Sequence, residues 1–440
     1  MSLKIVAIVL SVFTISFLIC GVALAVHAQP DLQTTKYRNM VLDLGNGLKT
    51  NARLNLPANG DGPFPGVLLV PGSGPTDMNE TAGYVRIANE TGLIKYPPSR
   101  LAFDIAEYLS ERGFAVLQYD KRGFGANLTV LDSNVFGNIT VDDLIQDTDK
   151  VLNVLVQQPE VDSNDVTLIG HSEGAQVVPR VVVNNPDLVD NIVLMGVVAQ
   201  NYSEIGEFQI VNLPVLYAQQ VLDQDHNGLI SVQEASKNPV LSSLLSPASL
   251  TLENPVFSSM VGNLTLALAQ NIITASGAAE QLNLQYNMNN DTFISINDEL
   301  KPKLIEYLKS LSVVTQGKKC KAVGEVCPFW LRSKYSSIPP LDIISKVPSD
   351  TSILIQQGKN DSQTPIQQAF LLQQRLTDVN HPDHTLITYP DLGHQFYPSS
   401  QWWTALGGPI EPKVLEDLFG WLSDPDRDFK KLTILSSQIP

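Results

Sequence analysis

The five-residue segment Gly170-His171-Ser172-Glu173-Gly174 follows the apolar run Val166–Ile169 and precedes the helix-compatible run Ala175–Arg180. A strand that passes so abruptly into a helix leaves no room for bulky side chains two positions before or after the central residue. Glycine stands at both positions, 170 and 174. The segment therefore predicts a sharp strand-to-helix turn that raises the Ser172 hydroxyl above the edge of a sheet, with the N-terminal end of the helix beside it.

Strands and helices are predicted to alternate on both sides of this turn. The chain first offers a hairpin, because Gly45-Asn46-Gly47 joins the strand-like runs Met40–Leu44 and Leu48–Leu56. Further strands are expected at Val67–Val70, Phe114–Tyr119, Asn191–Val197, Ile353–Gln356 and Thr385–Tyr389, and helices at Ser99–Arg112, Val141–Gln157 (with Thr140 as N-cap), Ile366–Leu376 and Pro412–Leu422. This order predicts an α/β protein with a mostly parallel sheet and helices on both faces.

The alternation stops between residues 200 and 346, where Leu, Asn, Gln and Ser predominate and the apolar spacing is mostly helical. We interpret this stretch as a mainly helical cap inserted into the α/β core. The predicted organisation is then residues 29–199 and 347–425 for the two parts of the core, 200–346 for the cap, and 426–440 for a C-terminal tail.

Residues 1–28 resemble a targeting segment. Lys4 precedes the apolar stretch Ile5–Ala25, and the small residues of Val26-His27-Ala28 fit a signal-peptidase site. An uncleaved membrane anchor is the alternative, since the stretch is close to the length that spans a bilayer. Either case predicts an extracytoplasmic protein. An oxidising compartment would allow Cys320 and Cys327 to form a disulfide.

The net charge of −16 argues against nucleic acid as a partner, because phosphate binding requires a basic face.

A serine hydroxyl needs a base to act as a nucleophile, and a third group to orient that base. Among the 6 histidines of the chain, His394 is the best candidate because it follows the last predicted strand. The side chain of His171 should point away from its neighbour Ser172. Asp361 lies on the turn after Ile353–Gln356 and would orient the imidazole. The order along the chain is Ser172, Asp361, His394.

Over residues 35–200 and 347–425 the chain resembles the esterase and dienelactone-hydrolase-like group of the α/β-hydrolase superfamily. The segment from Pro71 to Asp77 resembles the oxyanion loop of that group, with Pro71 in place of the usual histidine. Proline has no N–H, so the resemblance implies Ser73 and Glu173 as the backbone donors to an oxyanion. The segment Tyr119–Gly125 resembles the group's Asp-x-Arg-Gly loop, which we interpret as mainly structural.

The resemblance implies an esterase that cleaves small-molecule carboxylic esters through an acyl-enzyme, without a catalytic cofactor. A peptidase, amidase or acyltransferase could use the same residues. An alternative of another class is a non-catalytic calcium-binding protein on a hydrolase scaffold.

Residues 223–234 match the EF-hand calcium loop at each position that defines it. Side-chain oxygens of Asp223, Asp225 and Asn227, the carbonyl of Leu229, Ser231 directly or through water, and the carboxylate of Glu234 would bind Ca²⁺. The preceding run Leu213–Leu222 is compatible with an entering helix if Pro214 lies at its start. We expect calcium to stabilise the cap and to take no part in acyl transfer.

A second segment, 287–298, resembles this loop but has Thr292 in place of the glycine and Asp298 in place of the glutamate. We expect it to be a degenerate partner loop that pairs with the first through Ile230 and Ile294. Whether it binds metal is left open.

Overall fold

The computed structural model describes residues 35–74, 76–82, 86–89, 92–95, 99–126, 129–132, 135, 138–231, 234, 293–314, 337–399, 402, 408–424 and 434–435. The predicted targeting segment, Cys320 and Cys327, and the first part of the second loop all lie outside these residues. Within the described part of the chain, no helix combines the length and the apolar character needed to cross a membrane.

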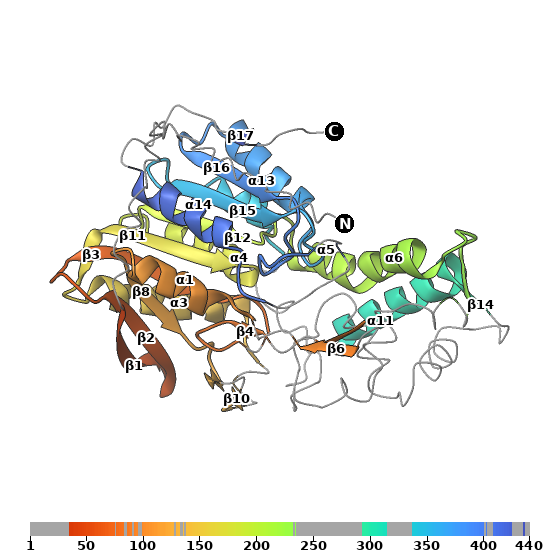
Figure 1. The fold of residues 1–440 in the computed structure, drawn as a ribbon, viewed down its shortest axis with the longest axis horizontal. Helices are drawn as coiled ribbons and strands as arrows, with labels where there is room; N and C mark the ends of the chain where they lie inside the picture. Colours follow the sequence, from red (N-terminus) through yellow and green to blue (C-terminus); the bar gives the residue numbers. More distant parts are fainter. Residues whose placement is uncertain are drawn as a thin grey trace, which may run out of the picture. The chain divides into compact units, whose positions relative to one another are not determined.

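A nine-stranded sheet with the order β1-β2-β8-β3-β11-β12-β15-β16-β17 forms the centre of the protein (Figure 1). From β8 onward neighbouring strands are parallel, whereas β1 and β2 form an antiparallel hairpin and β2 pairs antiparallel with β8. The predicted mostly parallel sheet and the predicted hairpin are both confirmed. The strands are β1 (Thr35–Gly45), β2 (Leu48–Pro57), β3 (Phe64–Val70), β8 (Ala115–Tyr119), β11 (Val161–His171), β12 (Asn191–Met195), β15 (Ser352–Gly358), β16 (His384–Tyr389) and β17 (Ile434–Leu435).

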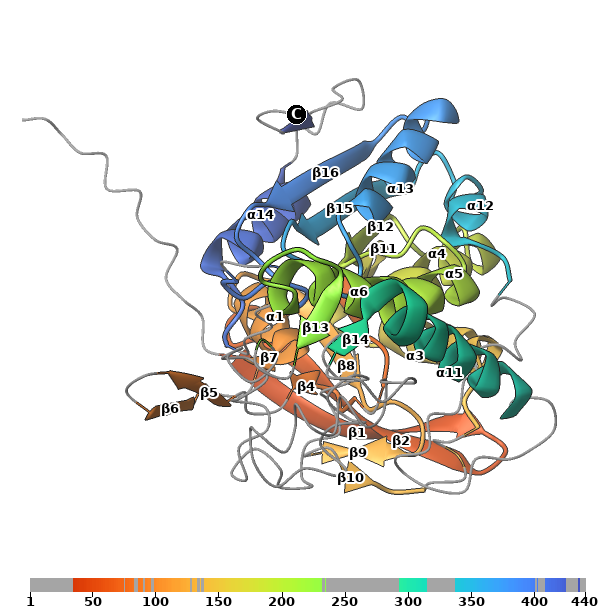
Figure 2. The same ribbon diagram turned by 90° about the vertical axis from the view of Figure 1, so that its right-hand side faces the viewer.

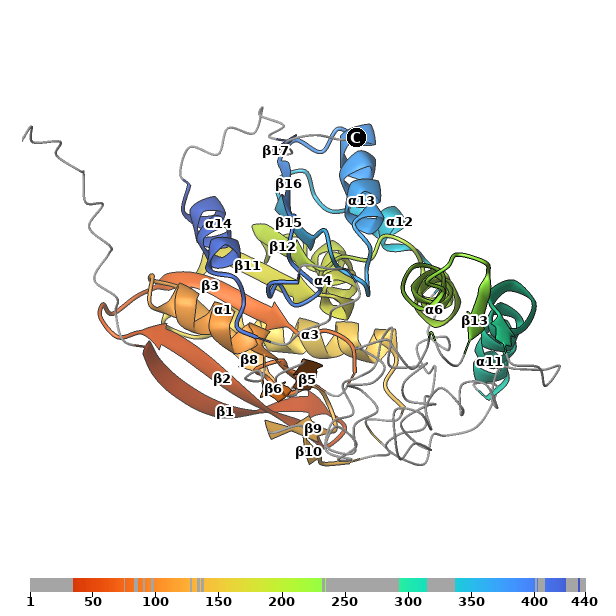
Figure 3. The same cartoon turned by 45° about the vertical axis from the view of Figure 1, so that its right-hand side comes forward.

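Helices cover both faces of this sheet, as Figure 3 shows for α14 on one side and α13 on the other. Successive residues of a strand point to opposite faces, so Val67 joins the core cluster under α1 and α14 and Leu68 the cluster under α3, α4 and α13. The helices are α1 (Leu101–Ser110), α3 (Val141–Val156), α4 (Glu173–Asn184), α12 (Pro340–Ile344), α13 (Gln367–Asp378) and α14 (Pro412–Ser423).

Thr140 caps α3 as the sequence predicts. Its hydroxyl accepts a hydrogen bond from the Asp143 amide, and the Asp143 carboxylate accepts one from the Thr140 amide. This reciprocal arrangement satisfies two groups that a helix terminus otherwise leaves unpaired.

The described part of the cap has a hydrophobic cluster of its own, which includes Ile210, Leu222, Ile230, Ile294 and Leu304. A continuous helical stretch is formed by α5 (Tyr202–Glu207), η2 (Phe208–Asn212), α6 (Leu213–Tyr217) and η3 (Ala218–Leu222), of which η2 and η3 are π-helical turns. Across from it lie η4 (Ile296–Leu300), also a π-helical turn, and α11 (Lys301–Val314) (Figure 2).

The strand β13 (Leu229–Ser231) pairs antiparallel with β14 (Phe293–Ser295), and Ile230 stands opposite Ile294. The predicted pairing of these two isoleucines is therefore confirmed. The α-helical segment α6 begins at Leu213 with Pro214 in its first turn, as expected, and it continues a helical stretch that already starts at Tyr202. The π-turn before Pro214 changes the local hydrogen-bond pattern at the point where proline cannot donate.

Three short two-stranded sheets complete the described structure. They pair β4 (Thr81–Ala82) with β7 (Ser99–Arg100), β5 (Arg86–Asn89) with β6 (Gly92–Lys95), and β9 (Phe124–Gly125) with β10 (Thr129–Val130).

Candidate active site

Ser172 occupies the sharp turn between β11 and α4, with φ 53° and ψ −112°. Such a conformation is strained for a residue with a side chain, and the surrounding backbone holds it. The Ser172 amide donates to the Met195 carbonyl at 2.8 Å. A Cβ at Gly170 would overlap the backbone of Gly174, and one at Gly174 would overlap the carbonyl of Val70. Both glycines are therefore required by close backbone approach, as the sequence predicts.

Asp361 and His394 form a buried pair. The Nδ1 atom of His394 lies 2.8 Å from Oδ2 of Asp361, whose side chain is fully buried. The other carboxylate oxygen of Asp361 accepts from the amides of Gln363 and Thr364, each at 2.8 Å. Burial alone would raise the pKa of Asp361, but the charge of His394 and the hydrogen bonds from His394 and Thr364 outweigh burial and lower it.

Ser172 and His394 both lie next to the end of β12. The Ser172 amide donates to the Met195 carbonyl, and the residue after Met195, Gly196, has φ 57°. A Cβ built on Gly196 would lie 3.1 Å from Cε1 of His394. The loop that carries His394 is in turn packed so closely on Gly358 that a Cβ there would overlap the Leu392 carbonyl. The structure thus brings Ser172, Asp361 and His394 to the carboxyl edge of one sheet.

In the predicted oxyanion loop, both the amide and the carbonyl of Gly72 are hydrogen-bonded to side chains outside the loop. The Gly72 amide donates to Oε1 of Glu80, and the Gly72 carbonyl accepts from Nζ of Lys121 at 2.6 Å. Ser73, the predicted donor, is the next residue and is exposed. The other predicted donor, the Glu173 amide, is the first of α4 and belongs to the N–H groups that a helix leaves without an internal partner.

Lys121 and Tyr202 contribute to this site, and the sequence did not reveal either. Nζ of Lys121 lies 2.8 Å from Oε2 of Glu173, and the Tyr202 hydroxyl donates to Oε1 of Glu173 at 3.2 Å. Both side chains of the Lys121–Glu173 pair are buried. The sequence signal for Lys121 is its position in the segment Tyr119–Gly125, whose resemblance to a family loop indicates a mainly structural role.

The other charged residues of that segment do have structural partners. Asp120 accepts from the Met78 amide at 2.7 Å and from Asn51 at 3.0 Å. Arg122 pairs with Asp143 and Asp147 on α3. For Asp120 and Arg122, the structural interpretation agrees with the contacts.

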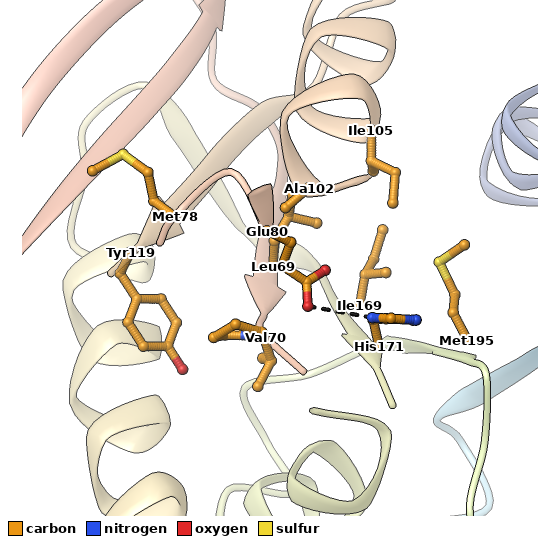
Figure 4. A pocket seen from close by; sticks show the side chains of 11 residues that line it. Leu69, Val70, Met78, Glu80, Ala102, Ile105, Tyr119, Ile169, His171 and Met195 are labelled. Carbon is orange, nitrogen blue, oxygen red and sulfur yellow. Dashed lines mark hydrogen bonds and ion pairs between the residues drawn. The ribbon is translucent and has the colours of Figure 1, made fainter. Parts of the chain in front are cut away.

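The ring of His171 lies beside that of His394, with centroids 4.7 Å apart. Together with Glu80, His171 lines a small, mostly apolar pocket (Figure 4). Its Nδ1 is 3.3 Å from Oε1 of Glu80, and its Nε2 is 3.0 Å from the His394 carbonyl. Burial lowers the pKa of an imidazole, yet the charge and hydrogen bond of Glu80 outweigh burial here and raise the pKa of His171.

In the predicted calcium loop, ligand-type oxygens of Asp223, Asp225 and Glu234 all lie within 4.8 Å of one another. Asp223 accepts hydrogen bonds from the amides of Asn227 and Gly228, and Glu234 accepts from the Ser231 hydroxyl. Gly228 has φ 83°, which suits glycine at the bend of such a loop. Leu229 lies at the start of β13.

Two family models match parts of the chain: serine aminopeptidase, S33, over residues 98–236, and the prolyl oligopeptidase family over residues 322–406. Together with the strand order and the strained serine between β11 and α4, these matches decide the fold. The chain has an α/β-hydrolase fold. The matched segments include Ser172, Asp361 and His394, the three residues at the sheet edge.

Among curated proteins, the chain is 33% identical to esterase EstD of Thermotoga maritima over 172 residues, which is 39% of the chain and 35% of the relative. The chain thus matches about a third of that esterase. Similar solved structures include Est1E from Butyrivibrio proteoclasticus (13% identity, 87% of this chain and 97% of that chain, TM-score 0.41). Others are GrgF from Penicillium sp. sh18 (13%, 88% and 98%, 0.43) and the acylaminoacyl peptidase of Pyrococcus horikoshii (12%, 82% and 38%, 0.40).

Proposed function

We propose that this chain is a serine hydrolase that cleaves carboxylic esters, with Ser172 as nucleophile, His394 as base and Asp361 as the residue that orients the base. The observation that carries the proposal is the 2.8 Å contact between His394 and the buried Asp361 at the same sheet edge as the strained Ser172. Esterase activity is supported by the similarity to an esterase over part of the chain.

The reaction would proceed in two steps. The Ser172 hydroxyl attacks the ester carbonyl while His394 takes its proton and then gives it to the leaving alcohol. Asp361 holds the imidazole in the tautomer with a proton on Nδ1 and stabilises the imidazolium. The amides of Ser73 and Glu173 would stabilise the oxyanion. Water then attacks the acyl-enzyme with His394 again as base. The bond between the acyl carbon and the Ser172 oxygen breaks, the proton passes from His394 to that oxygen, and the carboxylic acid leaves.

The direct test is labelling and turnover of a Ser172→Ala variant. We expect this variant to lose hydrolysis of p-nitrophenyl esters and labelling by a fluorophosphonate, while its circular dichroism stays unchanged. Ser163→Ala is the matched control, because Ser163 is an exposed residue of the same strand. Retention of activity in Ser172→Ala would refute the assignment, and absence of labelling in the wild type would favour a non-catalytic scaffold.

A peptidase or amidase is the second candidate, because both matching family models are named for peptidases. Esters and amides with the same acyl group distinguish the two. An esterase should cleave the ester and leave the amide essentially intact at equal concentration, whereas a peptidase should cleave both. Transfer of the acyl group to an added alcohol in preference to water would indicate an acyltransferase.

We also propose that Ca²⁺ binds the loop 223–234 and stabilises the cap. The converging carboxylates of Asp223, Asp225 and Glu234 and the pairing of β13 with β14 support this proposal. Asn227, Leu229 and Ser231 would supply the remaining oxygens. Calcium titration of chelator-treated protein should release or absorb heat and raise the melting temperature, and Glu234→Gln should abolish both effects. A calorimetric titration without heat, together with an unchanged melting temperature, would reject it.

Finally, we propose that the protein is exported, with residues 1–28 as a signal peptide or membrane anchor and with Cys320 and Cys327 joined by a disulfide. The apolar N-terminal stretch and the pair of cysteines in the rest of the chain support this. N-terminal sequencing of the protein from its native host distinguishes cleavage near residue 28 from an intact anchor. Peptide mapping with and without reductant tests the disulfide.

A further inference from the structure

We propose that Lys121 is a positioning residue that orients both amide donors of the oxyanion site, the N–H groups of Ser73 and Glu173. This inference rests on the proposed function and goes beyond it, since it assigns a role in the reaction to a residue outside the triad and the oxyanion loop. The proposal rests on one buried ammonium, that of Lys121, which contacts both the oxyanion loop and the first residue of α4.

The first contact acts on the Ser73 amide through its own peptide unit. Nζ of Lys121 donates to the Gly72 carbonyl at 2.6 Å, and that carbonyl belongs to the same planar peptide group as the N–H of Ser73. In a trans peptide the C=O and N–H point in opposite directions. An ammonium fixed on one side therefore determines where the N–H points on the other, and polarisation of the carbonyl makes the N–H a stronger donor.

The second contact acts on the turn that carries the other donor. Nζ of Lys121 lies 2.8 Å from Oε2 of Glu173, whose backbone N–H is the second proposed donor. The remaining carboxylate oxygen is held by the Tyr202 hydroxyl at 3.2 Å. The side chains of Lys121 and Glu173 are 4% and 10% exposed, so water screens their attraction only weakly. One ion pair thus links the peptide group of the first donor to the residue that carries the second.

Gly72 is also held from its other side, where its amide donates to the Glu80 carboxylate. The peptide unit before Gly72 is therefore tied to Glu80, and the unit after it is tied to Lys121. On the Gly72 carbonyl, the contact from Lys121 at 2.6 Å is much shorter than the contact from the Thr76 hydroxyl at 3.4 Å. Lys121 therefore makes the stronger contact with the peptide group that carries the Ser73 N–H, because Glu80 acts on the preceding one.

The experiment uses the full chain with three variants. Lys121→Met removes the ammonium. Lys121→Met/Glu173→Gln removes both charges, so that no carboxylate stays buried without its cation, a situation that can unfold a protein. Lys150→Met is the matched control, because Lys150 also donates to a backbone carbonyl, that of Leu44, and takes no part in the site.

For both Lys121 variants we expect kcat for p-nitrophenyl acetate to fall by about 10- to 100-fold. This decrease is no larger than the decrease in kcat that follows removal of one oxyanion donor. KM should change less than about two-fold. Binding of an aryl trifluoromethyl ketone, which forms a tetrahedral adduct with serine, should weaken by the same factor as kcat/KM falls. Lys150→Met should match the wild type in all three quantities.

A folded double variant whose kcat and ketone affinity stay within about three-fold of wild type would overturn the role of Lys121. An effect confined to KM, with kcat unchanged, would also overturn the role of Lys121. Failure of the proposed function gives a different result, because Ser172→Ala would then keep its activity and the ketone would not bind the wild type at all.

Discussion

The imidazole rings of His171 and His394 lie with centroids 4.7 Å apart, and Nε2 of His171 is 3.0 Å from the His394 carbonyl. His171 is the residue before the strained serine, so β11 contacts the loop of the proposed base directly. Through Nδ1 the same ring reaches Glu80, which also binds the Gly72 amide. His171 therefore connects the oxyanion loop to the loop of His394.

The raised pKa of His171 predicts a specific dependence of stability on pH. Because the pKa is higher in the folded than in the unfolded chain, the stabilisation is fully present below about pH 6.5 and is lost as the pH rises through the folded value. Glu80→Gln should remove this dependence, so its deficit in unfolding free energy should be largest near pH 6 and shrink toward pH 9. Urea unfolding across this range measures it. Glu207→Gln, at an exposed position, is the control, and parallel curves for wild type and Glu80→Gln would contradict the assignment.

Asp361→Asn should keep the fold and lose most activity, with kcat reduced on the order of 10⁴-fold, because an amide favours the wrong imidazole tautomer. The lowered pKa of Asp361 stabilises the wild type above about pH 4, and this contribution is lost as the pH falls through the folded value. The variant should therefore show a weaker loss of stability between neutral and acid pH. Steady-state kinetics and acid unfolding check the two effects. Asp350→Asn, at an exposed position, should behave as wild type; equal activity of the two variants would remove Asp361 from the mechanism.

Gly174→Ala should destabilise the protein by more than about 2 kcal/mol or prevent folding, because its Cβ would overlap the Val70 carbonyl and neither backbone can withdraw. Gly420→Ala provides the contrast. Gly420 is an exposed residue of α14 with nothing within 4 Å of a Cβ, and alanine should stabilise that helix by up to about 1 kcal/mol. Thermal unfolding of both variants tests the pair, and similar melting temperatures would show that the turn is not as tight as described.

Ile294→Ala should destabilise the cap by about 2–5 kcal/mol, because Ile294 is buried opposite Ile230 in the hydrophobic cluster of the cap. Its neighbour Phe293 is 40% exposed, so Phe293→Ala should cost less than about 1 kcal/mol. If calcium binds the adjacent loop, Ile294→Ala should also weaken calcium binding. Melting curves with calcium and with chelator measure both effects. An equal response of the two alanine variants would argue against coupling between the strands.

The sheet and the position of Ser172, Asp361 and His394 at one edge of it were predictable because both rest on local patterns. Short apolar runs bounded by turn residues mark the strands, and the ends of parallel strands share one edge, so Asp361 after β15 and His394 after β16 had to approach the turn at Ser172. Boundaries were less accurate. The strand β11 begins at Val161, earlier than the predicted Val166, because its pairing with β3 contains an irregularity between Asp162 and Val166 that interrupts the apolar pattern.

The roles of Lys121, Tyr202 and Glu80 could not be read from the sequence. Each role depends on contacts between a side chain and two or three elements that are distant in the chain. No local sequence pattern predicts such contacts. The π-turn before Pro214 could not be predicted for a related reason. Proline normally begins or breaks a helix, and its place inside the stretch Tyr202–Leu222 depends on how the cap packs.

The hydrogen bond from Tyr202 to Glu173 has a consequence for protein engineering. The first helical turn of the insertion begins with the reciprocal cap between Asn201 and Glu204. In this turn, the Tyr202 hydroxyl donates to the Glu173 carboxylate, which also binds the Lys121 ammonium. A truncated or chimeric version of this chain should therefore splice its foreign segment after Glu207 and keep that turn intact. Grafts made upstream of Tyr202 would remove the phenol that donates to Glu173.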